Sequence, residues 1–228
     1  MLGPVALVGG NEFRRESDAL DLALLALAGG PGAKLAILPT AATNENPEVV
    51  GENGIRHFTR LGGAPDKLLV VDDDSANEAA LAAALEAHDV VYLTGGDPAY
   101  LLDTLQGSLA WQAVLAVHRR GGLVAGSSAG AMLLGAQLWR FDGWVPGLGL
   151  APSLAVLPHH ATLSRRWSVA HMLATLPAEV TLVGIDESTA LLLPEGRVLG
   201  TGQVTVYSRN GPITYDPGTQ VPRRPLLE

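Results

Sequence analysis

Short apolar runs alternate with alanine- and leucine-rich stretches through the first half of the sequence, and this alternation restricts the fold more than any other feature. Four runs are typical of buried strands: Val5 to Val8, Lys34 to Leu38, Lys67 to Val71 and Asp89 to Leu93. Helix-like segments lie between them: Glu16 to Ala28, Pro47 to Leu61 and Asn77 to Ala87. This order predicts an α/β fold, with a twisted, mainly parallel sheet and helices on both faces.

The second half adds a fifth strand and then changes its pattern. A helix-like stretch from Leu109 to Val117 leads into the apolar run Leu123 to Ala125, and a helix-compatible run from Ala129 to Leu134 follows. Five short strand-like runs with intervening turns come last: Val180 to Ile185, Ala190 to Leu193, Val198 to Thr201, Val204 to Tyr207 and Ile213 to Tyr215. We expect them to form a short antiparallel extension at the sheet edge, so that residues 1–228 make a single domain.

Composition excludes several classes of function. The sequence has no cysteine, which excludes disulfides, thiolate metal sites and a cysteine nucleophile. Its net charge of -8 argues against binding a nucleic-acid backbone. The apolar runs are too short to span a membrane, and the first residues lack the pattern of a secretory signal. We therefore expect a cytoplasmic protein that binds neither nucleic acid nor membrane.

The run Gly126-Ser127-Ser128-Ala129-Gly130 lies between a predicted strand and a predicted helix. A G-x-S-x-G sequence in this setting places its central residue on a sharp turn that needs small neighbours. Ser128 is then exposed at the carboxyl end of the sheet, close to helix amides that favour a developing oxyanion. The alternative is a glycine-rich loop that only connects two elements or binds an anion. We interpret Ser128 as a nucleophile.

A second glycine-rich turn, Gly95-Gly96-Asp97, follows the run that ends at Leu93. Because the carboxyl ends of parallel strands meet at one edge, the amide of Gly95 or Gly96 can join that of Ala129 as an oxyanion donor. Asp97 precedes Pro98 and also suits the cap of the next helix. Taken alone, this turn is an ordinary connection.

A serine nucleophile needs a base, and the sequence offers six histidines. His159 and His160 follow the apolar run Leu154 to Pro158 and can reach the same edge. The other four fall on predicted helices or their ends, where we expect surface roles: His57, His88, His118 and His171.

An acid must then orient the histidine. Asp186 and Glu187 end the apolar run from Leu182 to Ile185, and Asp142 is a competing choice.

With these residues in place, the sequence resembles the peptidase E and cyanophycinase family of serine peptidases. The resemblance rests on segments spread along nearly the whole chain: Gly9 to Phe13, Leu38 to Ala42, Leu93 to Asp97, Gly126 to Ala131, Gly147 to Leu150, the region of His159, Gly184 to Ala190 and Gly200 to Val206. It implies a flavodoxin-like fold similar to that of class I glutamine amidotransferases. A glutaminase of that fold is excluded here, because its nucleophile is a cysteine.

The resemblance also implies roles for individual residues. The nucleophile falls on Ser128, the base on His159 and the orienting acid on Glu187, while Asp142 stays open as the acid of the peptidase E branch. The oxyanion amides fall on Gly96 and Ala129. A basic substrate-binding position falls on Arg165. No metal or cofactor is implied, and family members suggest a homodimer.

The sequence differs from the family at positions that are expected to determine substrate specificity. Asp97 stands where the member specific for amino-terminal aspartate has asparagine, and its carboxylate should repel an aspartyl side chain. Leu157 stands where cyanophycinases carry an aspartate. The expected activity is that of a dipeptidase or other exopeptidase, which hydrolyses a peptide or isopeptide bond in small peptides. The rivals are a non-catalytic ligand-binding protein and an esterase or amidase of non-peptide substrates.

Overall fold

The main sheet is built around the first strand of the chain. In the computed structural model, which describes residues 1–140, 143–164, 167–208 and 211–222, its strands are β1 (Val5–Val8), β2 (Lys34–Leu38), β3 (Ala64–Lys67), β4 (Val90–Leu93), β5 (Leu123–Ser127), β10 (Thr189–Leu193) and β11 (Arg197–Gly200). Their order is β11-β10-β1-β5-β4-β2-β3. Strands β1 to β5 pair in parallel, whereas β10 and β11 add an antiparallel edge next to β1.

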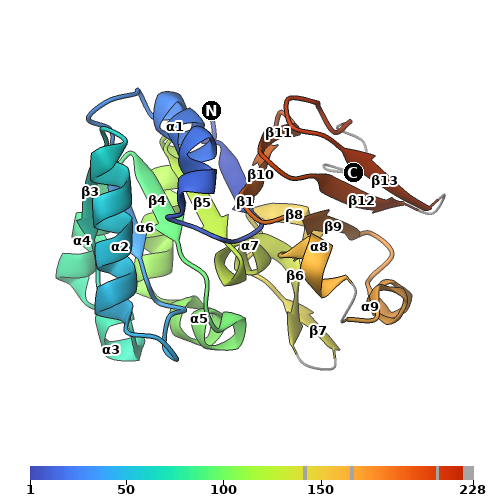
Figure 1. Cartoon of the computed structure of the whole chain (residues 1–228). Helices are drawn as coiled ribbons and strands as arrows, with labels where there is room; N and C mark the ends of the chain where they lie inside the picture. Colours follow the sequence, from blue (N-terminus) through green and yellow to red (C-terminus); the bar gives the residue numbers. More distant parts are fainter. Residues whose placement is uncertain (141–142, 165–166, 209–210, 223–228) are drawn as a thin grey trace.

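Helices cover both faces of this sheet, as the sequence predicts (Figure 1). They are η1 (Arg15–Ser17), α1 (Asp18–Leu27), α2 (Pro47–Arg60), α3 (Asp73–Ala76), α4 (Ala79–Glu86), α5 (Pro98–Leu105), α6 (Leu109–Arg119) and α7 (Ala129–Leu134). Strand β4 shows why both faces of the sheet have to be covered by helices. Tyr92 packs in one apolar cluster with Leu24 and Phe58, while Val91 packs in the other with Leu85 and Val114. A strand buried on both sides is apolar at every position, as β4 is.

A second sheet lies beside the first (Figure 1). Its strands are β6 (Gly135–Arg140), β7 (Gly143–Pro146), β8 (Ala151–Leu157), β9 (Thr181–Ile185), β12 (Val204–Ser208) and β13 (Gly211–Tyr215), in the order β13-β12-β9-β8-β6-β7. Strand β8 pairs in parallel with β6 and β9, and the other pairs are antiparallel. Two short helices, α8 (His160–Leu163) and α9 (Val169–Thr175), connect β8 to β9.

The α/β class predicted from the sequence is confirmed, but the C-terminal strands are divided differently. Only β10 and β11 extend the edge of the main sheet; β9, β12 and β13 belong to the second sheet. The reason is burial. Leu182 of β9 and Val206 of β12 pack with Leu138 of β6 in the core that also covers the main sheet. An extension at a single edge would leave these side chains without that cover.

The third strand begins earlier than predicted. It covers Ala64–Lys67 rather than Lys67 to Val71, and among the described strands its one partner is β2. Because β3 is an edge strand, Pro65 is tolerated within it even though proline has no N–H to donate.

Three of the histidines expected at the surface are buried. His57, His88 and His118 are 4%, 5% and 8% exposed. His57 Nε2 lies 2.7 Å from Asp21 Oδ2, and His88 Nε2 lies 2.9 Å from Asp66 Oδ2. Carboxylate partners make the burial of His57 and His88 possible. His118 Nδ1 is buried with no hydrogen-bond partner among the described residues. The surface prediction is therefore wrong for all three. His171 is exposed as predicted.

Candidate active site

Ser128 occupies a strained turn between β5 and α7. Its backbone has φ 50° and ψ −108°, a conformation that is rare for residues other than glycine. The flanking glycines are required by close packing. A Cβ on Gly126 would lie 2.5 Å from the backbone of Gly130, and one on Gly130 would lie 2.6 Å from the carbonyl oxygen of Leu93. The G-x-S-x-G spacing is therefore what allows β5 to turn into α7 at this point.

His159 brings its ring to the hydroxyl of Ser128. The residue follows β8 with a left-handed backbone, φ 48°, and its N–H donates to the carbonyl of Gly9 at 2.8 Å. His159 Nε2 lies 3.0 Å from Ser128 Oγ. The ring leaves no room for a side chain on Gly10, where a Cβ would lie 2.2 Å from it. The loop after β1 and the loop after β8 thus fix the ring between them.

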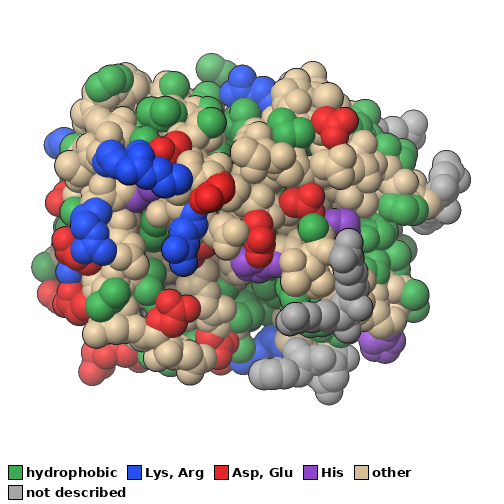
Figure 2. Space-filling view, viewed as in Figure 1, with side chains coloured by type: hydrophobic (Ala, Val, Ile, Leu, Met, Phe, Trp, Pro, Cys, Tyr) green, Lys and Arg blue, Asp and Glu red, His purple; other side chains and the backbone are tan. Residues whose placement is uncertain are grey.

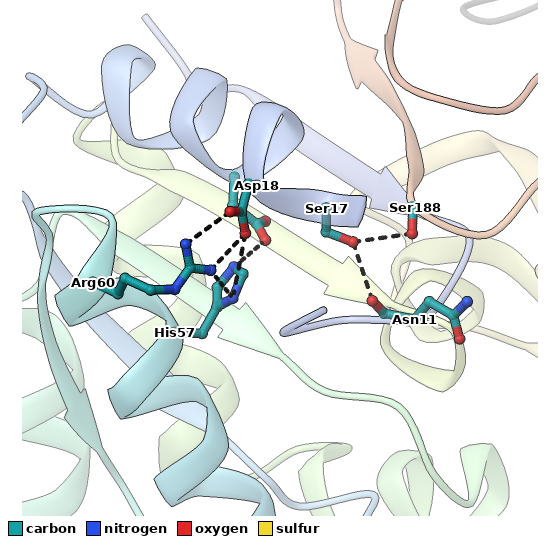
Figure 3. Close-up of polar contacts among 7 residues, drawn as sticks. Asn11, Ser17, Asp18, His57, Arg60 and Ser188 are labelled. Carbon is teal, nitrogen blue, oxygen red and sulfur yellow. Dashed lines mark hydrogen bonds and ion pairs between the residues drawn. The ribbon is translucent and has the colours of Figure 1, made fainter. Parts of the chain in front are cut away.

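Glu187 holds the other nitrogen of the same ring. Its Oε1 lies 2.7 Å from His159 Nδ1. The carboxylate has a second contact, because Asn11 Nδ2 donates to Glu187 Oε2 at 3.2 Å. The loop that carries Asn11 is tied down by Ser17, whose hydroxyl donates to the carbonyl oxygen of Asn11 at 3.1 Å and contacts the hydroxyl of Ser188 at 3.2 Å (Figure 3).

The alternative acid, Asp186, points to other partners. Its Oδ1 accepts the N–H of Ala161 at 3.0 Å and its Oδ2 accepts the N–H of Gln203 at 3.0 Å. These bonds join the segment after His159 to the start of β12. The structure therefore does not bring Asp186 to His159. Asp142, the other candidate, lies outside the described residues.

His160 faces away from Ser128. Its Nε2 lies 2.8 Å from the hydroxyl of Tyr207, and its Nδ1 lies 3.5 Å from Asp186 Oδ1. Burial lowers the pKa of His160 below its usual value of 6.5, although the nearby Asp186 acts in the opposite direction. Of the two histidines left open by the sequence, it is His159 that contacts the serine.

The Gly95-Gly96 turn is held against Ser128 by its neighbours. The N–H of Gly95 donates to Glu12 Oε1 at 2.7 Å, and the N–H of Asp97 donates to the carbonyl oxygen of Ala41 at 2.7 Å. Gly96 lies between them with φ 138°, and a Cβ there would lie 2.0 Å from that same oxygen. Only glycine fits this position. Ala129 begins α7, where the first N–H groups have no acceptor within the helix.

Two residues near Ser128 were not singled out individually from the sequence. Glu12 bridges two loops, because its Oε1 binds Gly95 and its Oε2 accepts the hydroxyl of Ser127 at 2.7 Å. Asn11 contacts Glu187. The available signal was their place in the run Gly9 to Phe13, directly after a strand that ends at the same edge as Ser128.

Asp97 caps α5. Its Oδ1 accepts the N–H groups of Ala99 and Tyr100 at 2.9 and 3.1 Å, with Pro98 at the first helical position. The capping interpretation is therefore confirmed, and the carboxylate also lines a cavity beside Ser128. Arg165, the expected basic position, lies outside the described residues.

Ser128 and His159 line two cavities. We call the first the arginine cavity: it has a volume of about 630 Å³ and includes Arg14, Arg15, Arg56 and Arg60. We call the second the apolar cavity: it has a volume of about 720 Å³ and includes Met132, Trp139, Leu163, Trp167 and Met172. Figure 2 shows Lys and Arg side chains gathered over the α1 and α2 half of one face, with a histidine near its centre.

The geometry at Ser128 defines a class of protein. A serine on a strand-to-helix turn, an imidazole at 3.0 Å and a carboxylate on the far ring nitrogen at 2.7 Å form the arrangement that serine hydrolases share. The sequence model of peptidase family S51 matches residues 5–200. The chain therefore belongs to peptidase family S51, the peptidase E and cyanophycinase family, and is a serine-type peptidase.

Individual relatives agree with this assignment. A cyanophycinase from Trichormus variabilis is 28% identical over 218 residues, which cover 89% of this chain and 72% of that protein. An uncharacterized peptidase from Listeria innocua is 35% identical over 104 residues, 45% of this chain and 47% of that protein. The crystal structure of a peptidase from an acI-B1 Actinobacterium is 28% identical, has a TM-score of 0.87 and matches 97% of each chain. A putative peptidase E protein from Listeria monocytogenes, 19% identical with a TM-score of 0.64, covers 95% of this chain and 99% of that one and shares the fold.

Proposed function

We propose that this peptidase hydrolyses a peptide or isopeptide bond in small peptides, with Ser128 as nucleophile, His159 as base and Glu187 as orienting acid. The observation that carries the proposal is the continuous chain of contacts Ser128 Oγ to His159 Nε2 at 3.0 Å and His159 Nδ1 to Glu187 Oε1 at 2.7 Å. Each member then has the partner that its role requires.

In the first half-reaction, Ser128 Oγ attacks the scissile carbonyl carbon while His159 Nε2 takes its proton. Glu187 accepts a hydrogen bond from the Nδ1–H of His159 and stabilises the imidazolium. The N–H groups of Gly96 and Ala129 donate to the oxyanion of the tetrahedral intermediate. His159 then gives the proton to the leaving amine, and an ester of Ser128 remains.

In the second half-reaction, water takes the place of the amine. His159 removes a proton from the water as it attacks the ester carbonyl, and returns that proton to Ser128 Oγ as the acid product leaves. All the groups needed come from this chain.

Small peptides are proposed as substrates because of the size of the two cavities that Ser128 lines. Cavities of about 630 and 720 Å³ are of the size that holds one small ligand or a few residues. Dipeptidase activity is the form of this proposal that we favour. The cytoplasmic location and the homodimer stay predictions from the sequence.

The test is turnover of a library of dipeptides and tripeptides, with free and blocked termini, followed by mass spectrometry. We expect hydrolysis by the unmodified protein and none by Ser128→Ala, with equal folding by circular dichroism. Hydrolysis of simple esters but of no peptide would favour the esterase alternative. Peptide hydrolysis retained in Ser128→Ala would contradict the proposal.

A further inference from the structure

The two cavities differ in chemistry, and Ser128 and His159 line both. If the proposed function holds, the scissile bond lies at Ser128, so the part of the substrate that carries the carbonyl occupies one side and the leaving part occupies the other. The charges that line each cavity then decide which part goes where.

The arginine cavity has an excess of positive charge. Arg60 is already paired with Asp18, through bonds of 2.7 and 2.6 Å (Figure 3). Arg14, Arg15 and Arg56 form no ion pair with any residue in the described part of the chain, and all three are exposed.

Two acids line the arginine cavity as well. Glu12 is held by the N–H of Gly95 and the hydroxyl of Ser127. The other acid, Glu45, shares the cavity with three guanidinium groups that form no ion pair in the described part of the chain. Of these, Arg56 donates a hydrogen bond to the side-chain oxygen of Asn53. A guanidinium binds a carboxylate through two parallel hydrogen bonds. The arginine cavity therefore suits a carboxylate of the substrate.

In the part of the chain that the structure describes, charged side chains also line the apolar cavity. Arg140 lines it but is paired with Asp103 at 3.0 Å. Among the described residues that line this cavity, Asp97 is the one acid, and no cation pairs with it. One of its oxygens caps α5. The carboxylate can still attract a free amino group.

The walls of the apolar cavity suit an apolar side chain. Two tryptophans, Trp139 and Trp167, line it together with Met132 and Met172. Tryptophan and methionine supply large apolar surfaces, and methionine adapts to irregular shapes. Ala129, whose amide is a proposed oxyanion donor, lines this cavity and not the arginine cavity. The residue that donates the scissile carbonyl is therefore best placed on the apolar side.

We propose that the substrate is a dipeptide with a large apolar or aromatic amino-terminal residue, whose side chain fills the apolar cavity with its amino group beside Asp97, and whose carboxyl-terminal carboxylate binds Arg14 and Arg56 in the arginine cavity. The opposite orientation places an ammonium group among arginines and a carboxylate beside Asp97, and both contacts are repulsive.

The test compares four peptides at one pH: Phe-Ala, Phe-alaninamide, N-acetyl-Phe-Ala and Asp-Ala. We expect kcat/KM for Phe-Ala to exceed that of each of the other three by roughly tenfold or more, since each loses a charged hydrogen bond or meets like charge. Equal turnover of Phe-Ala and Phe-alaninamide, or a preference for Asp-Ala, would overturn the proposal.

Variants assign the effect to residues. The double change Arg14→Gln with Arg56→Gln should raise the KM of Phe-Ala about tenfold. The KM of Phe-alaninamide, which has no carboxylate to bind these arginines, should not change. Asp97→Asn keeps the cap of α5, because asparagine caps equally well, and should narrow the gap between Phe-Ala and N-acetyl-Phe-Ala. Arg119 is an exposed arginine outside both cavities, so Arg119→Gln is the matched control. It should change neither the ratio of kcat/KM between Phe-Ala and Phe-alaninamide nor that between Phe-Ala and N-acetyl-Phe-Ala. Equal losses on acid and amide in the arginine double variant contradict the inference.

Results that contradict the inferred specificity can be told apart from a failure of the proposed peptidase function. In that case none of the four peptides is hydrolysed and a fluorophosphonate probe does not label Ser128.

Discussion

The hydroxyl of Ser127 donates a 2.7 Å hydrogen bond to Glu12 Oε2. Ser127 is completely buried, whereas the adjacent Ser128 is partly exposed and lines two cavities. Two neighbouring serines thus have opposite environments, one inside the protein and one beside the imidazole of His159. Glu12 also binds the N–H of Gly95. Through Glu12, Ser127 therefore helps to hold the Gly95-Gly96 turn next to the turn that carries Ser128.

The buried position of Ser127 predicts an effect on stability rather than on chemistry. Ser127→Ala should keep most of the peptidase activity and lower the free energy of unfolding by about 1 to 3 kcal/mol, because Glu12 Oε2 loses a hydrogen bond to its charged carboxylate. Urea unfolding and steady-state kinetics on one preparation measure both quantities. A variant of unchanged stability and abolished activity would show that Ser127 takes part in the reaction.

The two adjacent histidines should also respond differently. His159→Ala should reduce kcat by about 10⁴-fold or more, as loss of a triad base does in other serine peptidases. His160→Gln should cost far less, because His160 contacts Tyr207 and Asp186 rather than Ser128. Steady-state kinetics on the best dipeptide of the library compare them. A larger loss of kcat in the His160 variant would mean that the base is His160 and not His159.

The neighbouring acids provide a third comparison. Glu187→Gln keeps the shape of the side chain but removes the charge that stabilises the imidazolium of His159, and we expect kcat to fall by roughly 10³- to 10⁴-fold. Asp186→Asn loses one of two backbone hydrogen bonds, and we expect a lower melting temperature with little change in kcat. Should Asp186→Asn abolish turnover at temperatures where it is folded, the orienting acid has been misassigned.

The lowered pKa of His160 predicts how stability depends on pH. Burial is the main cause, so the folded protein binds a proton at His160 less readily than the unfolded chain does. Stability should therefore fall as pH drops below 6.5, the usual value, and stop falling once pH is below the folded pKa. Each unit of pKa lowering corresponds to about 1.4 kcal/mol.

His160→Gln tests this prediction, because glutamine has no proton to gain. Between pH 7.5 and pH 5.5 the variant should lose less unfolding free energy than the unmodified protein. Burial also lowers the pKa of His118, but His118 is present in both proteins and its contribution cancels. Equal losses in the two proteins would exclude His160 as a source of the pH dependence.

The local pattern of the sequence predicts the main sheet well and the second sheet poorly. Strands such as β4 are apolar at every position because both faces are covered, and this pattern is visible without the fold. In contrast, Leu182 of β9 and Leu191 of β10 pack in the same apolar cluster although their strands belong to different sheets, because β9 pairs with β8 and β10 pairs with β1. Two short apolar runs in succession do not reveal which strand each of them pairs with.

The candidate site was predictable to the extent that its residues follow strands. Ser128, His159 and Glu187 all come directly or shortly after an apolar run, and parallel strands bring their carboxyl ends together. Glu12 and Asn11 escaped prediction because their roles depend on contacts with residues more than a hundred positions away, Ser127 and Glu187. The burial of His57 depends similarly on Asp21, 36 positions earlier.

Covalent labelling of the serine tests directly whether Ser128 is the nucleophile. The protein is treated with a fluorophosphonate probe, digested, and mapped by tandem mass spectrometry, with Ser127→Ala and Ser128→Ala as the matched pair. We expect one label, on Ser128, that is kept in Ser127→Ala and lost in Ser128→Ala. A label on another residue, or none on a protein that hydrolyses peptides, would contradict it.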